Sequence, residues 1–287
     1  MLRAILDTNE PQVSMKPLWA IAAFATSAAF VTSIFAQWLV LLFEQHIRAR
    51  SAGRIVDTPL TLCRGALIVQ LTLAAVVILM LKRYPVLRPR VTASLRLSLL
   101  SLIGSLGLVL GLAPIANDLG VRFAEALHQS PENTAWVSQI VRNANSGEFV
   151  LLALVLTLAP AFVEEYLFRG VLTGALLGAP TWLTLGLQAL AFGVFHVDPA
   201  QGMATFILGL GFGFVRLRTG TLTAAIVSHA TYNGIVLASI RFARHQAPDP
   251  SAHQSLSLVL AGALLSAVCI VALRRRGLPS QPAVGGS

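Results

Sequence analysis

Two adjacent carboxylates and an arginine interrupt an otherwise apolar stretch of the chain. Residues 156–172 read "LTLAPAFVEEYLFRGVL" and hold Glu164, Glu165 and Arg169. An ionisable group at membrane depth costs several kcal/mol unless it is paired or hydrated, so it usually faces the interior of a helical bundle and marks function. Glu165 and Arg169 stand four residues apart on one helix face and are expected to neutralise each other. Glu164 points about 100° around the helix, which leaves its carboxylate available for chemistry.

Three further polar residues interrupt later apolar stretches. The segments "AFGVFHVD" and "VSHATYNG" contain His196, His229 and Asn233. His229 and Asn233 are four residues apart and therefore share one helix face. A histidine in an apolar helix is by itself more often a hydrogen-bonded core residue than a catalyst. Beside a buried glutamate, the balance favours a catalytic role.

The composition places these residues in a membrane protein. Of the 287 residues, 55% are hydrophobic and 11% are charged, and the mean hydropathy is +0.74. Soluble domains carry about 25% charged residues. The alternating pattern of a membrane barrel is absent, so the expected fold class is all-α: a polytopic membrane protein with about eight transmembrane helices and the catalytic cluster within the bundle. The predicted spans are 18–43, 60–81, 95–116, 148–177, 181–197, 200–216, 221–240 and 256–273.

Helix arithmetic predicts that the polar residues meet at one depth. The fourth and fifth spans form a hairpin about residues 178–180, and each helical residue rises about 1.5 Å. Glu164 and His196 would then both lie roughly 20–25 Å from that turn. The seventh span begins near Gly220 on the same side of the membrane. This puts Asn233 roughly 20 Å from that side and His229 one helical turn closer to it. One polar cluster is therefore expected from three helices.

Three parts of the chain are predicted from this pattern. Residues 1–147 contain the N-terminal transmembrane helices and an amphipathic loop, 117–147, with short amphipathic runs at 121–127 and 135–141. The apolar faces of these runs suit the membrane interface, a lid over a site, or packing on the bundle itself. Residues 148–240 form the catalytic core. Residues 241–287 contain the last transmembrane helix and a tail whose composition is typical of disorder.

The polar residues form an ordered set of motifs that resembles a known family. The motifs are Glu164-Glu165-x-x-x-Arg169, then Phe192-x-x-x-His196, then His229-x-x-x-Asn233. Together they are similar to the three motifs of the CAAX-protease and bacteriocin-processing (CPBP) family of intramembrane glutamic endopeptidases. The resemblance covers about residues 148–240, and the combination is specific although any single motif would be weak.

The resemblance implies a peptidase that hydrolyses a peptide bond with a glutamate-activated water. By similarity, Glu164 is the general base, and His196 helps to hold the water. His229 and Asn233 would donate hydrogen bonds to the oxyanion of the tetrahedral intermediate. Glu165 and Arg169 support the site, with Arg169 orienting Glu165. Phe192, which also belongs to a motif, is expected to pack rather than react.

Alternatives of different classes stay open at this point. No cofactor is expected, but Glu164, His196 and His229 could complete a three-ligand zinc site with an open fourth position. The zinc-protease sequence HExxH is absent. A proton-coupled transporter also uses acids and histidines near the middle of the bilayer, although no repeated halves are present. A non-catalytic membrane partner could share the fold, but its motifs would be degraded.

The resemblance and the charge distribution together predict substrate and location. The implied substrate is a protein or peptide with a membrane-embedded, lipidated or sorting-signal C-terminal tail, cut near that tail within the lipid bilayer. The net charge of +9 falls in short basic clusters beside the spans, which indicates membrane topology rather than a nucleic-acid partner. This bias predicts a multi-pass protein of a bacterial inner membrane with cytoplasmic termini. The helix arithmetic places the cluster nearer the opposite face, which favours an exported substrate.

Overall fold

The described part of the chain is entirely helical. The computed structural model describes residues 58–88, 97–128, 132–176, 178–242 and 253–274, with parts of 20–38. Within these residues every regular element is a helix, and no strand occurs. Five of these helices are long and apolar enough to cross a membrane: Pro59–Arg83 (α2), Leu99–Ala126 (α4), Ser146–Leu176, Pro199–Thr219 (α10) and Leu256–Arg274 (α12). The predicted fold class, an all-helical polytopic membrane protein, is confirmed.

Polar caps and turn residues set the ends of the helices. The side chain of Thr58 accepts a hydrogen bond from the backbone of Thr61 at the start of α2, and Asp198 caps α10 in the same way. Such caps satisfy backbone N–H groups that have no partner inside the helix. Gly178 and Gly220 have φ angles of 108° and 70°, and Gly220 is the C-cap of α10. Both predicted turns therefore form where glycine permits a left-handed backbone.

Two further helices agree in position with predicted spans. Helix α9 covers Thr181–Phe195 and helix α11 covers Leu222–Phe242. With 15 residues, α9 is about 22 Å long, which is shorter than the roughly 30 Å hydrocarbon core. The first predicted span, 18–43, lies largely outside the described residues, as does the tail after residue 274. The total of eight spans therefore stays a prediction.

The prediction that a loop begins at residue 117 is wrong. Helix α4 continues without interruption through Asn117 and ends at Ala126, so the run 121–127 belongs almost wholly to this helix. An i to i+4 ion pair between Asp118 and Arg122 stabilises the extension. The second amphipathic run forms a separate helix, α5, over Glu132–Asn143. A short 3₁₀ turn, η1, covers Pro85–Leu87 after α2.

The helix that carries the two glutamates is not a uniform α-helix. It begins with α6, Ser146–Ala153, behind a capping box made by Asn145 and Glu148. It widens into π-helical turns at η2, Leu154–Leu158, and again at η3, Tyr166–Leu172. The glutamates lie between them in α7, Ala159–Glu165, and α8, Thr173–Leu176, ends the helix. Such π-helical turns occur frequently at functional sites.

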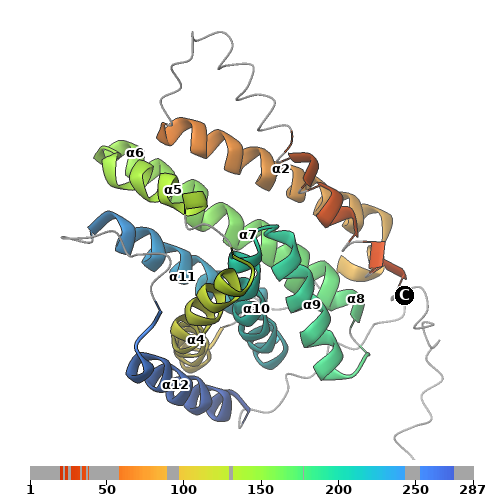
Figure 1. Ribbon diagram of the computed structural model, residues 1–287. Helices are drawn as coiled ribbons and strands as arrows, with labels where there is room; N and C mark the ends of the chain where they lie inside the picture. Colours follow the sequence, from red (N-terminus) through yellow and green to blue (C-terminus); the bar gives the residue numbers. More distant parts are fainter. Residues whose placement is uncertain are drawn as a thin grey trace, which may run out of the picture.

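Small residues let the helices approach closely around this segment. In Figure 1, α2 lies alongside the 146–176 helix, while α4 packs against α10 and α12. A Cβ atom added at Gly111 of α4 would lie 2.7 Å from the carbonyl oxygen of Gly262 in α12. Close backbone contact of this kind is the usual way in which transmembrane helices pack. The resulting core surrounds the middle of the 146–176 helix, from which it buries Leu167, Phe168 and Val171.

Candidate active site

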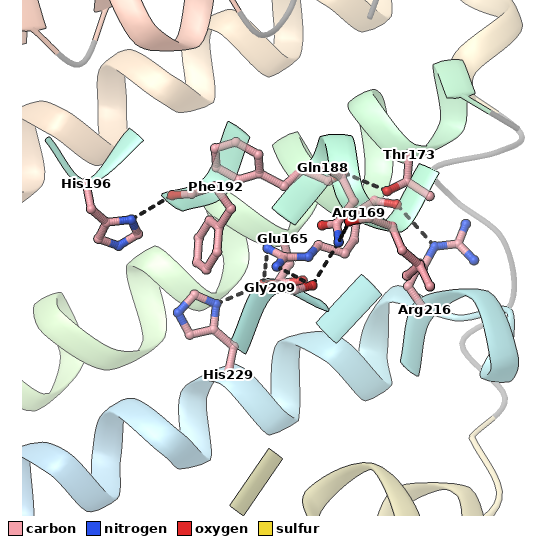
Figure 2. A network of polar contacts seen from close by, with 11 residues as sticks. Glu165, Arg169, Thr173, Gln188, Phe192, His196, Gly209, Arg216 and His229 are labelled. Atoms are coloured by element: carbon pink, nitrogen blue, oxygen red, sulfur yellow. Dashed lines mark hydrogen bonds and ion pairs between the residues drawn. The ribbon is translucent and has the colours of Figure 1, made fainter. Parts of the chain in front are cut away.

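A fully buried ion pair lies at the centre of the site. Nη1 of Arg169 donates a hydrogen bond to Oε1 of Glu165 at 2.9 Å, and neither side chain is exposed. The two residues occupy adjoining parts of one helix, α7 and η3. Figure 2 shows the pair at the middle of a polar network that other helices complete. The structure therefore brings together the two residues that their spacing placed on one helix face.

His229 joins this pair from a different helix. Its Nδ1 lies 2.9 Å from the same carboxylate oxygen, Oε1 of Glu165. The imidazole is buried and stacks on the ring of Phe212, with ring centroids 4.9 Å apart and an interplanar angle of 20°. Because a carboxylate only accepts hydrogen bonds, Nδ1 of His229 carries the hydrogen in this contact. Glu165 thus fixes both the position and the orientation of the ring.

Arg169 is held by aromatic rings and by a backbone carbonyl. Its guanidinium carbon lies 4.3 Å from the ring centroid of Phe192 and 5.1 Å from that of Phe212. Its Nη2 donates to the carbonyl oxygen of Gly209 at 3.3 Å, and Nε2 of Gln188 donates to the same oxygen at 2.8 Å. Cation–π contacts gain strength when the cation is desolvated. The arginine is therefore a fixed part of the core rather than a mobile surface charge.

Glu164 has a different environment from its neighbour. It is 5% exposed, and its Oε1 accepts a hydrogen bond from Nε2 of Gln70 in α2 at 2.9 Å. Among the described residues, its Oε2 has no hydrogen-bond donor. No arginine or lysine pairs with it there. Oε2 of Glu165 also lacks a hydrogen-bond partner among the described residues, but it is fully buried, whereas the Glu164 side chain keeps a small exposure.

His196 lies at the end of α9 and is partly exposed. Its Nδ1 is 2.8 Å from the carbonyl oxygen of Phe192, so Nδ1 donates and Nε2 is left as an acceptor when the ring is neutral. Its ring lies edge-on to the ring of Phe192, with centroids 5.0 Å apart, and the centroid of Phe192 is also 5.8 Å from that of His229. These interactions place His196 near the buried cluster, at its more exposed side.

The turn that follows His196 has an unusual backbone. Val197 has a φ angle of 61°, a conformation that a β-branched residue rarely adopts. The next residue, Asp198, donates its backbone N–H to the carbonyl oxygen of His196 at 2.6 Å and caps α10. Backbone strain of this kind persists only where the surrounding structure fixes it, and it is frequent at active sites.

Asn233 is the motif residue that the structure does not join to the others. It is half-buried on α11, one turn beyond His229. Within the described residues it makes no hydrogen bond to another member of the motifs. Its neighbour Tyr232 donates a hydrogen bond to Oδ1 of Asn117 in α4 at 3.2 Å. Among the described residues, only its place on α11 positions the amide of Asn233.

The described residues form no ready-made metal site. Among the described residues, no group of three or more His, Cys, Asp or Glu side chains could hold a metal ion. The proposed ligands were Glu164, His196 and His229. The Nδ1 atoms of both histidines are engaged in hydrogen bonds, so only their Nε2 atoms remain for another partner.

Several site residues were not predicted from the sequence. They are Gln70, Gln188, Gly209, Phe212 and Arg216, the last of which donates from Nε to the carbonyl oxygen of Arg169 at 3.3 Å. Gln70 and Gln188 did carry a signal, because each is a lone amide inside a predicted span. Gly209 acts through its backbone, for which no side-chain signal exists. Phe212 resembles any other apolar residue of a membrane helix.

A comparison with protein families agrees with the motifs. Residues 146–235 match the family model described as type II CAAX prenyl endopeptidase Rce1-like. This range contains all three motifs and nearly coincides with the predicted core, 148–240. No curated protein matches the chain, and no solved structure matches it. The match over residues 146–235 is consistent with the CPBP resemblance of the motifs and supports a peptidase.

Proposed function

We propose that this intramembrane endopeptidase uses Glu164 to activate a water molecule and cuts its substrate near a C-terminal tail. The family match gives the general activity, an endopeptidase, and the apolar helices give the membrane setting. The glutamate mechanism and the choice of substrate are the proposal. It depends on the different environments of two adjacent carboxylates.

The division between Glu164 and Glu165 is the observation that carries the proposal. Glu165 is fully buried, and its carboxylate is bound by both Arg169 and His229. Its negative charge is therefore already paired. Among the described residues, the Glu164 side chain accepts a hydrogen bond only from the neutral amide of Gln70, through one oxygen. A general base must have an oxygen within hydrogen-bond reach of the proton that it removes. Oε2 of Glu164 meets that requirement better than Oε2 of Glu165, which has no hydrogen-bond partner among the described residues but is fully buried.

His196 supports the same assignment from the other side of the water. With Nδ1 bound to Phe192, its Nε2 accepts a hydrogen bond from the water and orients the lone pair for attack. The partial exposure of His196 gives water a way to this point. The water therefore lies between the carboxylate and the imidazole, next to the buried cluster.

The oxyanion is stabilised by His229 and Asn233. Because Nδ1 of His229 donates to Glu165, its Nε2 can donate only when the ring is protonated. In the protonated ring Nε2 donates to the oxyanion, and the charges of the two glutamates, Arg169 and His229 then sum to zero. Each oxyanion donor is worth about 2.7–4 kcal/mol of transition-state stabilisation.

The reaction then follows in two steps that conserve atoms and charge. Glu164 removes a proton from the water while the water oxygen bonds to the scissile carbonyl carbon. The carbonyl oxygen becomes the oxyanion. The oxyanion collapses, the carbon–nitrogen bond breaks, and the protonated Glu164 gives its proton to the leaving amine. The products are a carboxylic acid and an amine, and the carboxylate of Glu164 is restored.

The substrate and location follow from the resemblance and the charge distribution. We propose a protein or peptide whose C-terminal tail is membrane-embedded, lipidated or a sorting signal, and which is cut within the bilayer. We place the enzyme in a bacterial inner membrane with cytoplasmic termini, since the basic clusters flank the spans on that side.

Replacing each glutamate by glutamine tests the base. In purified enzyme, Glu164→Gln should lower peptide cleavage by about a hundred- to ten-thousandfold, since an amide of equal size cannot take a proton. Glu165→Gln should lower it less, and both proteins should remain folded in detergent. Equal residual activity in the two variants would remove Glu164 from the role of base. Retention of full activity in both would favour a different reaction centre.

Chelation tests the metal alternative. If Glu164 and the histidines act on water directly, incubation with a strong chelator should leave the cleavage rate almost unchanged. Metal analysis of the active enzyme should also find less than one zinc ion per chain. Loss of activity that added Zn²⁺ restores would make the metal-dependent mechanism the better one.

A further inference from the structure

The amide of Gln70 lies beside the proposed base but comes from outside the family-matched range. Gln70 belongs to α2, whereas the match covers residues 146–235. The side chain interrupts the apolar sequence "LIVQLTL" and is 8% exposed. An amide in the hydrocarbon region is costly unless it is hydrogen-bonded, so its place in the bundle interior indicates a specific partner.

That partner is Glu164, which is 94 residues away in the sequence. Nε2 of Gln70 donates to Oε1 of Glu164 at 2.9 Å, and α2 packs along α7 over this contact. A hydrogen bond to an ionised group is stronger than one between neutral groups and restricts the carboxylate more. With Oε1 held in this way, the carboxylate plane is fixed, and Oε2 is the oxygen that remains for the water.

The other end of the same amide points to an incomplete site. Oε1 of Gln70 is buried and has no hydrogen-bond partner among the described residues. Buried acceptors are rarely left unpaired in folded proteins. A peptide N–H of a bound substrate, or the water itself, has the donor that this oxygen lacks.

We infer that Gln70 is a positioning residue that holds Glu164 for catalysis, so that α2 contributes to a site otherwise built from residues 146–235. This inference depends on the proposed role of Glu164. The effect of Gln70 on the reaction is exerted through the carboxylate and not through the stability of the fold.

Substitution of Gln70 by methionine tests the inference, because methionine has a similar volume without a donor. We expect kcat to fall roughly ten- to hundredfold, the size of a hydrogen bond to a charged group, with KM changed less than about twofold. Gln70→His, which offers a ring N–H at similar reach, should recover part of kcat. Thr72→Val is the matched control in the same helix, since among the described residues the Thr72 hydroxyl donates only to the carbonyl oxygen of Ile68 in its own helix.

A double-mutant cycle with Glu164→Asp separates positioning from a structural effect. If Gln70 acts through the Glu164 side chain, Gln70→Met should cost less than about twofold when added to the impaired Glu164→Asp enzyme. Additive losses, or a Gln70→Met enzyme with the kcat of the unaltered protein, would overturn the inference about Gln70. If Glu164→Gln is inactive in the same assay, the role of Glu164 as base still stands. Full activity in Glu164→Gln would overturn both. Thermal midpoints in detergent should be equal for the unaltered, Gln70→Met and Thr72→Val proteins, and a large loss in Gln70→Met alone would assign it a structural role.

Discussion

The same pair of an acid followed four residues later by arginine occurs in two regions of the molecule. In the core, Glu165 and Arg169 are 2.9 Å apart with no exposure of either side chain. Near the end of α4, Asp118 and Arg122 are 2.7 Å apart, but 60% of the arginine side chain is exposed. Each acid also has a histidine within 3.3 Å, His229 in the first case and His253 in the second.

The two regions differ in hydration rather than in geometry. Water can solvate Arg122 when its pair breaks, and exposed ion pairs contribute only about 0–1 kcal/mol. Water cannot solvate Arg169 in the same way, because aromatic rings and the Gly209 carbonyl surround its guanidinium group. The spacing alone therefore does not identify an active site. Dehydration distinguishes the core pair from the pair in α4, since buried charges must be balanced by neighbouring groups.

The largest difference should appear when the arginines are replaced. Arg169→Gln leaves the buried Glu165 without its main counter-charge and should lower the free energy of unfolding by about 3–5 kcal/mol. Arg122→Gln should lower it by no more than about 1 kcal/mol. Reversible unfolding of both proteins in mixed detergent micelles measures the two values. Equal losses would show that burial does not separate the two pairs.

A smaller difference is expected when the acids are neutralised and activity is measured. Glu165→Gln removes the charge that holds His229 and should slow cleavage roughly ten- to hundredfold, the size of a charged hydrogen bond. Asp118→Asn, the matched change at the exposed pair, should alter the rate by less than twofold. If the two variants lose activity to the same extent, the polar end of α4 also belongs to the reaction.

The smallest effect is expected from a change that marks the exposed region without disturbing it. Glu125 contacts His253 near the start of α12, whereas Gly104 packs on Leu273, so Glu125 and Arg274 lie at opposite ends of the α4–α12 pair. With Cys63 and Cys269 replaced by serine, Glu125→Cys should react with an impermeant thiol reagent on intact cells, with activity unchanged.

Arg274→Cys in the same background is the control for sidedness. It should be protected in intact cells and react only after the membrane is permeabilised, because the termini are predicted to be cytoplasmic. The reverse labelling pattern would invert the topology and direct the site toward cytoplasmic substrates.

Local sequence signals predicted much of the helical layout. Long apolar runs set most of the helices, and the turns at Gly178 and Gly220 form where glycine permits positive φ. The spacing of Glu165 and Arg169 also predicted their contact, because four residues return to the same helix face. These features depend on neighbours within one or two helical turns.

Features that depend on tertiary contact could not be read in the same way. The partner of Gln70 lies 94 residues away, and the Gly209 carbonyl has no side-chain signal at all. The end of α4 was misplaced because Asn117 and Asp118 are typical of helix boundaries, whereas contacts with Tyr232 and Arg122 keep the helix intact. Local propensity was overridden there by partners from other turns and helices.

Because of the π-helical turns on either side of the glutamates, the direction in which Glu164 points depends on the number of residues in the helix. A wide turn accommodates an extra residue, so the faces of 146–153, 159–165 and 173–176 are out of phase with those of a continuous α-helix. Deleting a single residue within Leu154–Leu158 would regularise the first wide turn and rotate Glu164 by about 100° relative to the start of its helix. Every motif residue would still be present, but the carboxylate of Glu164 would lose its contact with Gln70. In this helix an insertion or deletion is therefore a more severe change than most substitutions.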